Sequence, residues 1–216
     1  MSTPPAGPAP RSTFLGPEGT FAHAALLSLP GARDAVALPE ATVTAAIDAV
    51  REGRADGALV PIENSVEGAV PATLDELATG EPLVIAAETY LPVIFAVFAR
   101  PGAALAEVRS VATHPHAEAQ CRRWLMTHLP DAELRLVGST AGGAAAVAAG
   151  TADAAVAPRV AGQLYGLQAL ADDVADRPGA VTRFVLLTRT AAPGPPTGND
   201  RTTLVAHLRA DHAGAL

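Results

Sequence analysis

The chain has 216 residues, of which 49% are hydrophobic and only 4% aromatic, so it can bury a core made mostly of Ala, Val and Leu. All 15 basic residues are Arg, which excludes a Schiff-base lysine and a lysine-dependent phosphate loop. The formal net charge of −7 argues against a protein that follows nucleic-acid phosphates.

The single cysteine, Cys121, excludes an internal disulfide and a Cys-rich zinc or iron–sulfur site, which favours a reducing, cytoplasmic setting. The longest apolar run, over 91–99, is far shorter than the roughly 20 residues of a membrane helix, so we expect no membrane partner. Residues 1–10 have neither the charged start nor the apolar stretch of a signal peptide.

Short apolar runs alternate with helical patterns along most of the chain. Val43, Ile47 and Val50 form one stripe at helical spacing, which predicts a helix over 42–51, and a second helix is expected over 118–129. Strands are expected near 13–15, 35–38, 57–60, 83–86, 93–99, 108–112, 134–137, 154–157 and 184–187. This alternation predicts an α/β architecture with largely parallel sheets.

The last part of the chain has a different composition. Residues 191–200 have the Pro, Gly and polar content of a linker. Residues 201–216 have the pattern of one strand, a turn and the first residues of a helix, and they are too few to bury a core. We therefore expect them to begin a further domain.

Polar clusters follow four of the expected strands directly. They are Gly16–Phe21 (GPEGTF), Pro61–Gly68 (PIENSVEG), Thr113–Gln120 (THPHAEAQ) and the pair at 139–140. Ligands of open α/β sheets bind at the carboxyl ends of the strands, where the next helix offers free N–H groups to an anion. The pattern therefore favours a small anionic ligand held in a crevice.

Each cluster also has a purely structural interpretation. Glu63 and Asn64 have the character of a helix cap or a turn. His114 and His116 form a pair without a third ligand at suitable spacing, so we expect no metal site. His23 lies among alanines on a helical pattern and is interpreted as a packing residue.

The remaining polar residues are open to two interpretations as well. Ser139 and Thr140 are typical of a helix N-cap, which does not prevent contact with a ligand. Cys121 is better interpreted as a packing residue of a helix than as a nucleophile. Residues 182–184, taken alone, predict an edge strand with one charged side chain.

Five segments in this order resemble the prephenate dehydratase family. They are FLGPEGTFAHAA (14–25), VPIENSVEGAV (60–70), THPHAEAQC (113–121), YGLQ (165–168) and TRF (182–184). The resemblance covers about residues 13–190. Residues 202–216 look like the opening of the ACT regulatory domain of this family, without its later ESRP-type motif. L-phenylalanine is therefore expected as an effector only where a complete ACT domain is present.

The resemblance implies two α/β lobes around a cleft, similar to type II periplasmic binding proteins. The catalytic domain would cover 12–190, with lobe one at about 12–88 plus 178–190 and lobe two at about 89–177. The chain would cross between the lobes twice, and TRF would lie at the return crossing and face the cleft. Closure of the lobes around a ligand is then expected.

The reaction implied by the resemblance is the loss of CO2 and hydroxide from prephenate, a dicarboxylate, to give an aromatic ring. Aromatisation drives it, so no cofactor or metal is expected. By resemblance, Thr182 assists the departure of the hydroxyl group. Arg183 is the candidate for gripping a carboxylate. Glu63 is a candidate proton source, provided that burial favours its protonated form.

The remaining site residues would bind the substrate. Asn64, Thr113 and Gln120 are neutral hydrogen-bonding residues at family positions that line the cleft. Phe184 would either form an apolar wall near the ring or pack the crossing strand. Ser139 and Thr140 complete the candidate substrate-binding set.

Other functions remain open at this stage. The same site would suit dehydration of arogenate, the amino analogue of prephenate, and the fold would suit a non-catalytic two-lobed sensor of small acids. An unrelated α/β enzyme would scatter Thr182, Arg183 and Glu63 over different faces. The family resemblance also implies a homo-oligomer, either a dimer or a tetramer.

Overall fold

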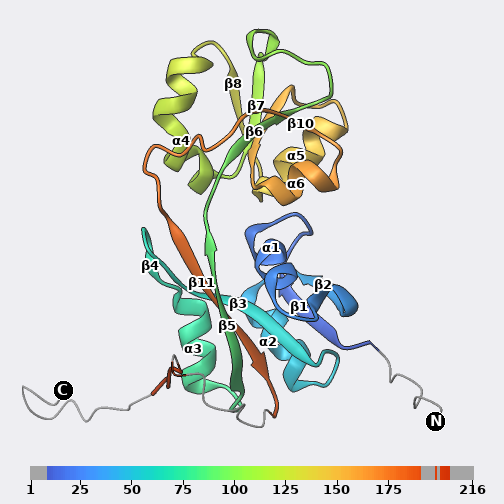
Figure 1. Ribbon diagram of the computed structural model, residues 1–216, viewed down its shortest axis with the longest axis vertical. Helices are drawn as coiled ribbons and strands as arrows, with labels where there is room; N and C mark the ends of the chain where they lie inside the picture. Colours follow the sequence, from blue (N-terminus) through green and yellow to red (C-terminus); the bar gives the residue numbers. More distant parts are fainter. Residues whose placement is uncertain (1–8, 191–197, 199, 205–216) are drawn as a thin grey trace, which may run out of the picture.

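The computed structural model describes residues 9–190, 198 and 200–204, and it consists of two lobes stacked along the long axis (Figure 1). The first lobe contains β1 (Arg11–Leu15), α1 (Phe21–Ser28), β2 (Val36–Glu40), α2 (Val43–Arg51), β3 (Gly57–Asn64), β4 (Gly68–Ala69), α3 (Pro71–Thr79), β5 (Val84–Pro92) and β11 (Val181–Thr188), with a short 3-10 turn at Ala32–Asp34. The second lobe contains β6 (Ala96–Ala99), β7 (Ser110–Thr113), α4 (Pro115–His128), β8 (Glu133–Leu136), α5 (Thr140–Ala148), β9 (Ala154–Ala157), α6 (Arg159–Leu164) and β10 (Gln168–Ala171), with a 3-10 turn at Leu105–Glu107. The expected two-lobed α/β fold is confirmed.

Each lobe has its own sheet, and both sheets are mixed. The first has the order β2-β1-β3-β11-β5 with β4 paired to β3, and the second has the order β10-β6-β9-β7-β8. Around β1 and β7 the pairing is parallel, whereas β11 runs antiparallel to β3 and β5, and β6 runs antiparallel to β9 and β10. The expectation of largely parallel sheets is therefore wrong. β5 leaves the first lobe and β11 returns to it, so these two strands must run in opposite directions.

The two crossings between the lobes lie side by side. They cover residues 93–95 and 172–180, and they are joined by hydrogen bonds from Val93 N–H to the Ala180 carbonyl (2.8 Å) and from Val174 N–H to the Phe95 carbonyl (3.0 Å). The first crossing begins after Pro92, because β5 stays paired with β11 as far as that residue. The strand expected over 93–99 therefore begins only at Ala96.

β11 is an interior strand and not the edge strand that residues 182–184 suggest when taken alone. It pairs with β3 on one side and with β5 on the other, and β5 itself forms the edge. Side chains of a strand point alternately to the two faces of its sheet. Phe184 packs with Phe14 and Leu59 against α1, whereas Val185 packs into the cluster formed with α2 on the other face. This alternation decides where the site residues of β11 point.

Side-chain caps fix the helix starts that face the other lobe. The hydroxyl of Thr20 accepts the His23 N–H at the start of α1, and that of Ser139 accepts the Gly142 N–H at the start of α5. The Nδ1 atom of His114 accepts the His116 N–H at the start of α4. A capping side chain of this kind stabilises a helix by about 1 kcal/mol.

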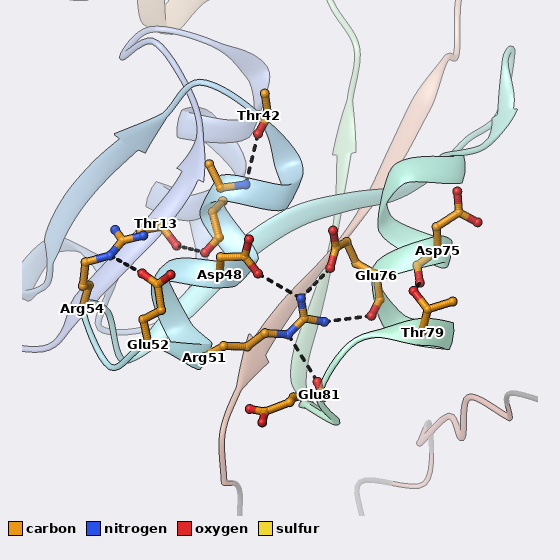
Figure 2. A network of polar contacts seen from close by, with 12 residues as sticks. Thr13, Thr42, Asp48, Arg51, Glu52, Arg54, Asp75, Glu76, Thr79 and Glu81 are labelled. Carbon is orange, nitrogen blue, oxygen red and sulfur yellow. Dashed lines mark hydrogen bonds and ion pairs between the residues drawn. The ribbon is translucent and has the colours of Figure 1, made fainter.

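Arg51 holds the far end of the first lobe together, away from the crossings (Figure 2). Its guanidinium reaches carboxylate oxygens of Glu76 (2.5 Å) and Asp48 (3.0 Å), and also donates to the carbonyls of Glu76 and Glu81. These contacts join α2 to α3.

In the part of the chain that the structure describes, no helix is both long and apolar enough to cross a membrane.

Candidate active site

Thr182 and Asn64 form a hydrogen-bonded pair at the end of the first sheet nearest the second lobe. They lie opposite each other on β11 and β3, and the Asn64 amide Nδ2 donates to the Thr182 hydroxyl oxygen over 2.8 Å. Thr182 is only 8% exposed. The Asn64 Oδ1 atom accepts the N–H groups of Val66 and Glu67, which fixes the direction of the amide. Since the hydroxyl oxygen accepts from Asn64, its own hydrogen remains available for another acceptor.

Arg183 points to the opposite face of β11. Its Nε and Nη2 atoms donate to the Glu88 carboxylate on β5, at 2.9 Å and 2.6 Å, and its guanidinium lies 6.0 Å from the centre of the Tyr90 ring. Burial opposes its charge, but the hydrogen bonds and charge of Glu88 outweigh this and leave the pKa of Arg183 above its ordinary value. The structure therefore does not bring Arg183 together with Thr182, and the guanidinium already holds a carboxylate of the chain itself.

Arg201, near the last described residues of the chain, lies beside the same carboxylate. Its Nε atom lies 3.6 Å from Glu88, and its guanidinium lies over the Tyr90 ring at 5.4 Å. Glu88 and Tyr90 are thus shared between Arg183 of β11 and Arg201, which follows the last strand. No local pattern in the sequence indicates this cluster, because Glu88 and Tyr90 lie far along the chain from both arginines.

Glu63 lies directly opposite Arg183 in the pairing of β3 with β11, and it is exposed. The burial on which its expected role as a proton source depends is therefore not present in this structure. The register of the pair shifts between Arg183 and Phe184, which gives β3 one extra residue at this point.

The second lobe contributes Gln120 from α4. It lines a cavity of about 520 Å³ together with Val66, Glu67, His116, Ala119, Arg123, Asp176 and Arg177. These residues come from the β3–β4 turn, from α4 and from the return crossing, so the cavity lies between the lobes. A contact of 3.2 Å between His116 Nδ1 and Glu67 Oε1 bridges the same gap.

Two of the expected substrate-binding residues are sealed inside the lobes. Thr113 is 0% exposed, and its hydroxyl donates to the Val156 carbonyl of β9 over 2.8 Å. This geometry favours a structural role that joins β7 to β9. Phe184 is 3% exposed and packs in the core beneath α1, so of its two interpretations the structure supports packing of the crossing strand.

A second hollow, of about 540 Å³, lies between the lobes at the carboxyl end of β1. Gly16, Pro17, Pro39, Glu40 and Ala41 line it from the first lobe, and Gly138, Ser139 and Gly142 from the second. Ser139 is the N-cap of α5, as its sequence context predicts, and Thr140 follows as the first helical residue. The N–H groups of this helix start favour an anion.

The lobes also touch directly through the loop before α1. A Cβ at Gly19, which has a φ of +84°, would lie 3.3 Å from atoms of Ala141 and Ala161 in the second lobe. Nearby, the rings of Phe21 and Phe95 meet edge to face with centroids 5.2 Å apart. Only glycine combines this backbone conformation with so close an approach.

Neither a metal site nor a thiol nucleophile is indicated by the described residues. They contain no cluster of three or more His, Cys, Asp or Glu side chains placed to hold a metal ion. Cys121 is buried, and burial, assisted by Asp176 and Glu118, raises the pKa of its thiol to about 12. The interpretation of Cys121 as a packing residue is confirmed.

Known proteins match this chain over most of its length. The profile of the prephenate dehydratase family covers residues 13–192. A protein of Mycolicibacterium vanbaalenii named prephenate dehydratase is 51% identical over an alignment 215 residues long, and the match covers 92% of this chain and 68% of that protein. The chain therefore spans about two thirds of the length of that relative.

Solved structures also match this chain over most of its length. The crystal structure of prephenate dehydratase from Arthrobacter aurescens in complex with L-Phe has a TM-score of 0.87 and 47% identity, and the match covers 95% of this chain and 69% of that one. A structure described as a novel type of quorum quenching acylase has a TM-score of 0.71 and 33% identity, over 86% of this chain and 66% of that one. The chain thus belongs to the prephenate dehydratase family.

Proposed function

We propose that this chain converts prephenate to phenylpyruvate, CO2 and water, and that it is a carbon–oxygen lyase. The observation that supports this most directly is the hydroxyl of Thr182, which is oriented by Asn64 at the boundary between the lobes and keeps its own hydrogen available. The reaction needs one such donor, because hydroxide is a poor leaving group unless a hydrogen bond or a proton stabilises it.

Thr182 acts in this proposal as the hydrogen-bond donor to the departing hydroxyl group. The hydrogen bond strengthens as negative charge develops on the leaving oxygen, so it stabilises the transition state more than the bound substrate. The C–O bond breaks as the ring carboxylate leaves as CO2, and the electron pair of the C–C bond enters the new aromatic ring. The released hydroxide takes up a proton from the medium, so the products are phenylpyruvate, CO2 and water. Asn64 keeps the donor oriented, and the lobes exclude bulk water from it.

The two carboxylates of prephenate require positive partners. Arg123 and Arg177 line the cavity beside Gln120, and the N-terminus of α5 offers N–H groups beside Ser139 and Thr140. We assign the substrate carboxylates to these groups in place of Arg183, whose guanidinium is held by Glu88 on the other face of β11. Gln120 supplies a neutral hydrogen bond from the second lobe.

Turnover of the 216-residue chain tests the function. Prephenate is supplied and the formation of phenylpyruvate is measured by chromatography, with arogenate as the competing substrate in a parallel assay. Formation of phenylpyruvate supports the proposal. Faster turnover of arogenate would make the chain an arogenate dehydratase, and tight binding of prephenate without any product would make it a sensor.

The proposal extends to the oligomeric state, the cellular location and the effector of the protein. We infer a homo-oligomer in the cytoplasm, and an effector role of L-phenylalanine only where a complete ACT domain follows. Residues 205–216, where most of the expected start of that domain lies, are outside the described residues. Size-exclusion chromatography with light scattering measures the oligomeric state.

A further inference from the structure

We infer that Asp176, on the return crossing, is a positioning residue for Gln120 in the reaction proposed above. Asp176 belongs to none of the strand-end motifs. It lies between β10 and β11, six positions before Thr182 in the numbering of the chain. The inference rests on the proposed function. Its structural basis is a set of hydrogen bonds between Asp176 and the backbone of α4.

Asp176 contacts the backbone of α4 at the turn that carries Gln120. Its Oδ2 atom accepts the Arg123 N–H over 2.9 Å, and its Oδ1 atom accepts the Trp124 N–H over 3.2 Å. Its own N–H donates to the Gln120 carbonyl over 2.7 Å. A backbone carbonyl, two helical amides and a carboxylate thus meet at one point in the middle of α4.

These contacts are unusual for the middle of a helix. In an uninterrupted α-helix the N–H of residue 124 donates to the carbonyl of residue 120, and the N–H of residue 123 donates to that of residue 119. Here the Asp176 carboxylate receives both N–H groups, and the Asp176 N–H approaches the carbonyl of Gln120. These contacts tie the turn of α4 that carries Gln120 to the return crossing. We therefore infer that Asp176 sets the position from which the Gln120 side chain projects.

The same short segment also fixes the other half of the site. Val181 N–H donates to the Ser65 hydroxyl over 2.9 Å, and the Ser65 N–H donates back to the Val181 carbonyl over 2.9 Å. Ser65 follows Asn64, and Val181 precedes Thr182. Residues 176–182 therefore connect the turn of α4 that bears Gln120 to the Thr182–Asn64 pair, and Asp176 is the anchor at the second-lobe end.

A double-mutant cycle distinguishes positioning from simple stabilisation. The Asp176→Asn variant keeps the size of the side chain but turns one acceptor into an NH2 donor that faces an N–H donor. We expect it to lower kcat/KM for prephenate by about 10²-fold, the loss that a misplacement near 1 Å produces. Gln120→Ala lowers kcat/KM on its own, and in that background Asp176→Asn produces no further loss, because the residue it positions is already absent.

A matched control is available at the other end of the second lobe. Asp153 also accepts from a backbone amide and a hydroxyl, those of Arg109 (3.1 Å) and Ser110 (2.9 Å), at the end of β7 remote from α4. Asp153→Asn is expected to change the melting temperature but to leave kcat/KM unchanged. If Asp176→Asn does not fold, Asp176→Glu replaces it in the cycle, since it keeps both oxygens and the charge but lengthens the side chain by one methylene.

The outcomes separate this inference from the function on which it rests. Loss in the wild-type background that vanishes in the Gln120→Ala background supports positioning. Losses that multiply in the double variant, or Asp176 variants with wild-type kcat/KM, overturn it while the dehydratase function stands. A wild-type chain without turnover of prephenate overturns both.

Discussion

Replacing Thr182 by Val removes the proposed donor with little change of shape. The two side chains are nearly isosteric, and Thr182 is buried, so the variant leaves the backbone of β11 paired on both sides. What is lost is the acceptor of the Asn64 amide and the free hydroxyl hydrogen. The first loss concerns stability and the second concerns the rate, so the two are measured separately.

The stability cost is small because Asn64 is only half-buried and water can replace the lost acceptor. One net hydrogen bond amounts to about 1 kcal/mol, which lowers the melting temperature of a domain of this size by about 2–4 °C. Loss of a donor to the leaving group lowers kcat by about 10²–10⁴-fold, which corresponds to about 2.7–5.4 kcal/mol of transition-state stabilisation. The expected effect on the rate therefore exceeds the expected effect on folding.

Steady-state kinetics with prephenate and thermal unfolding followed by circular dichroism measure both effects. The matched control is Thr188→Val at the other end of β11, where the hydroxyl donates to the Thr190 carbonyl over 3.2 Å. We expect the control to retain wild-type kcat. A Thr182→Val variant with wild-type kcat would refute the donor role, and a variant that loses only affinity for prephenate would make Thr182 a binding residue.

Two further predictions concern the neighbourhood of the site. Arg183→Met should lower the free energy of unfolding by about 1–3 kcal/mol, between the values for exposed and buried ion pairs, with KM for prephenate unchanged. Chemical denaturation and kinetics check this, and a raised KM at wild-type stability would contradict it. Burial lowers the pKa of His23 from 6.5, despite the opposing charge of Glu18, and the neutral ring accepts the Gly19 N–H. The unfolded chain therefore binds more protons below pH 6.5, so the melting temperature should fall on acidification through that value, and His23→Leu should reduce this fall.

The strand-end motifs predicted which residues lie between the lobes better than they predicted the contacts of individual side chains. Gly16, Gln120 and Ser139 line the hollows between the lobes, as the carboxyl ends of the preceding strands imply. Asn64 is the last residue of β3. Those positions follow from local patterns, namely an apolar run, a polar turn and a helix start. The sequence therefore predicts the position of a residue well where a single strand, its following turn and the next helix determine that position.

Thr113, Arg183 and Asp176 show what such patterns cannot provide. Whether the hydroxyl of Thr113 faces the cleft or the neighbouring strand depends on β9, which lies some forty residues later in the chain and accepts its hydrogen bond. The partner of Arg183 is decided by the pairing of β11 with β5, and that of Asp176 by the return crossing over α4. These are contacts between distant segments, and no local propensity encodes them.

The alternation of β11 places neighbouring side chains of the TRF segment on different faces of the sheet. Thr182 faces the side of the sheet that meets Asn64, and Arg183 faces the side where Glu88 and Arg201 lie. Consecutive residues of a strand cannot both point into the same crevice unless the strand is distorted between them. The register shift between Arg183 and Phe184 places its extra residue on β3, so it does not turn Arg183 toward Thr182. Thr182, the proposed donor, and the ion-paired Arg183 are thus neighbours along the chain, but the sheet places their side chains on opposite faces. Substitutions at the two positions should therefore act independently.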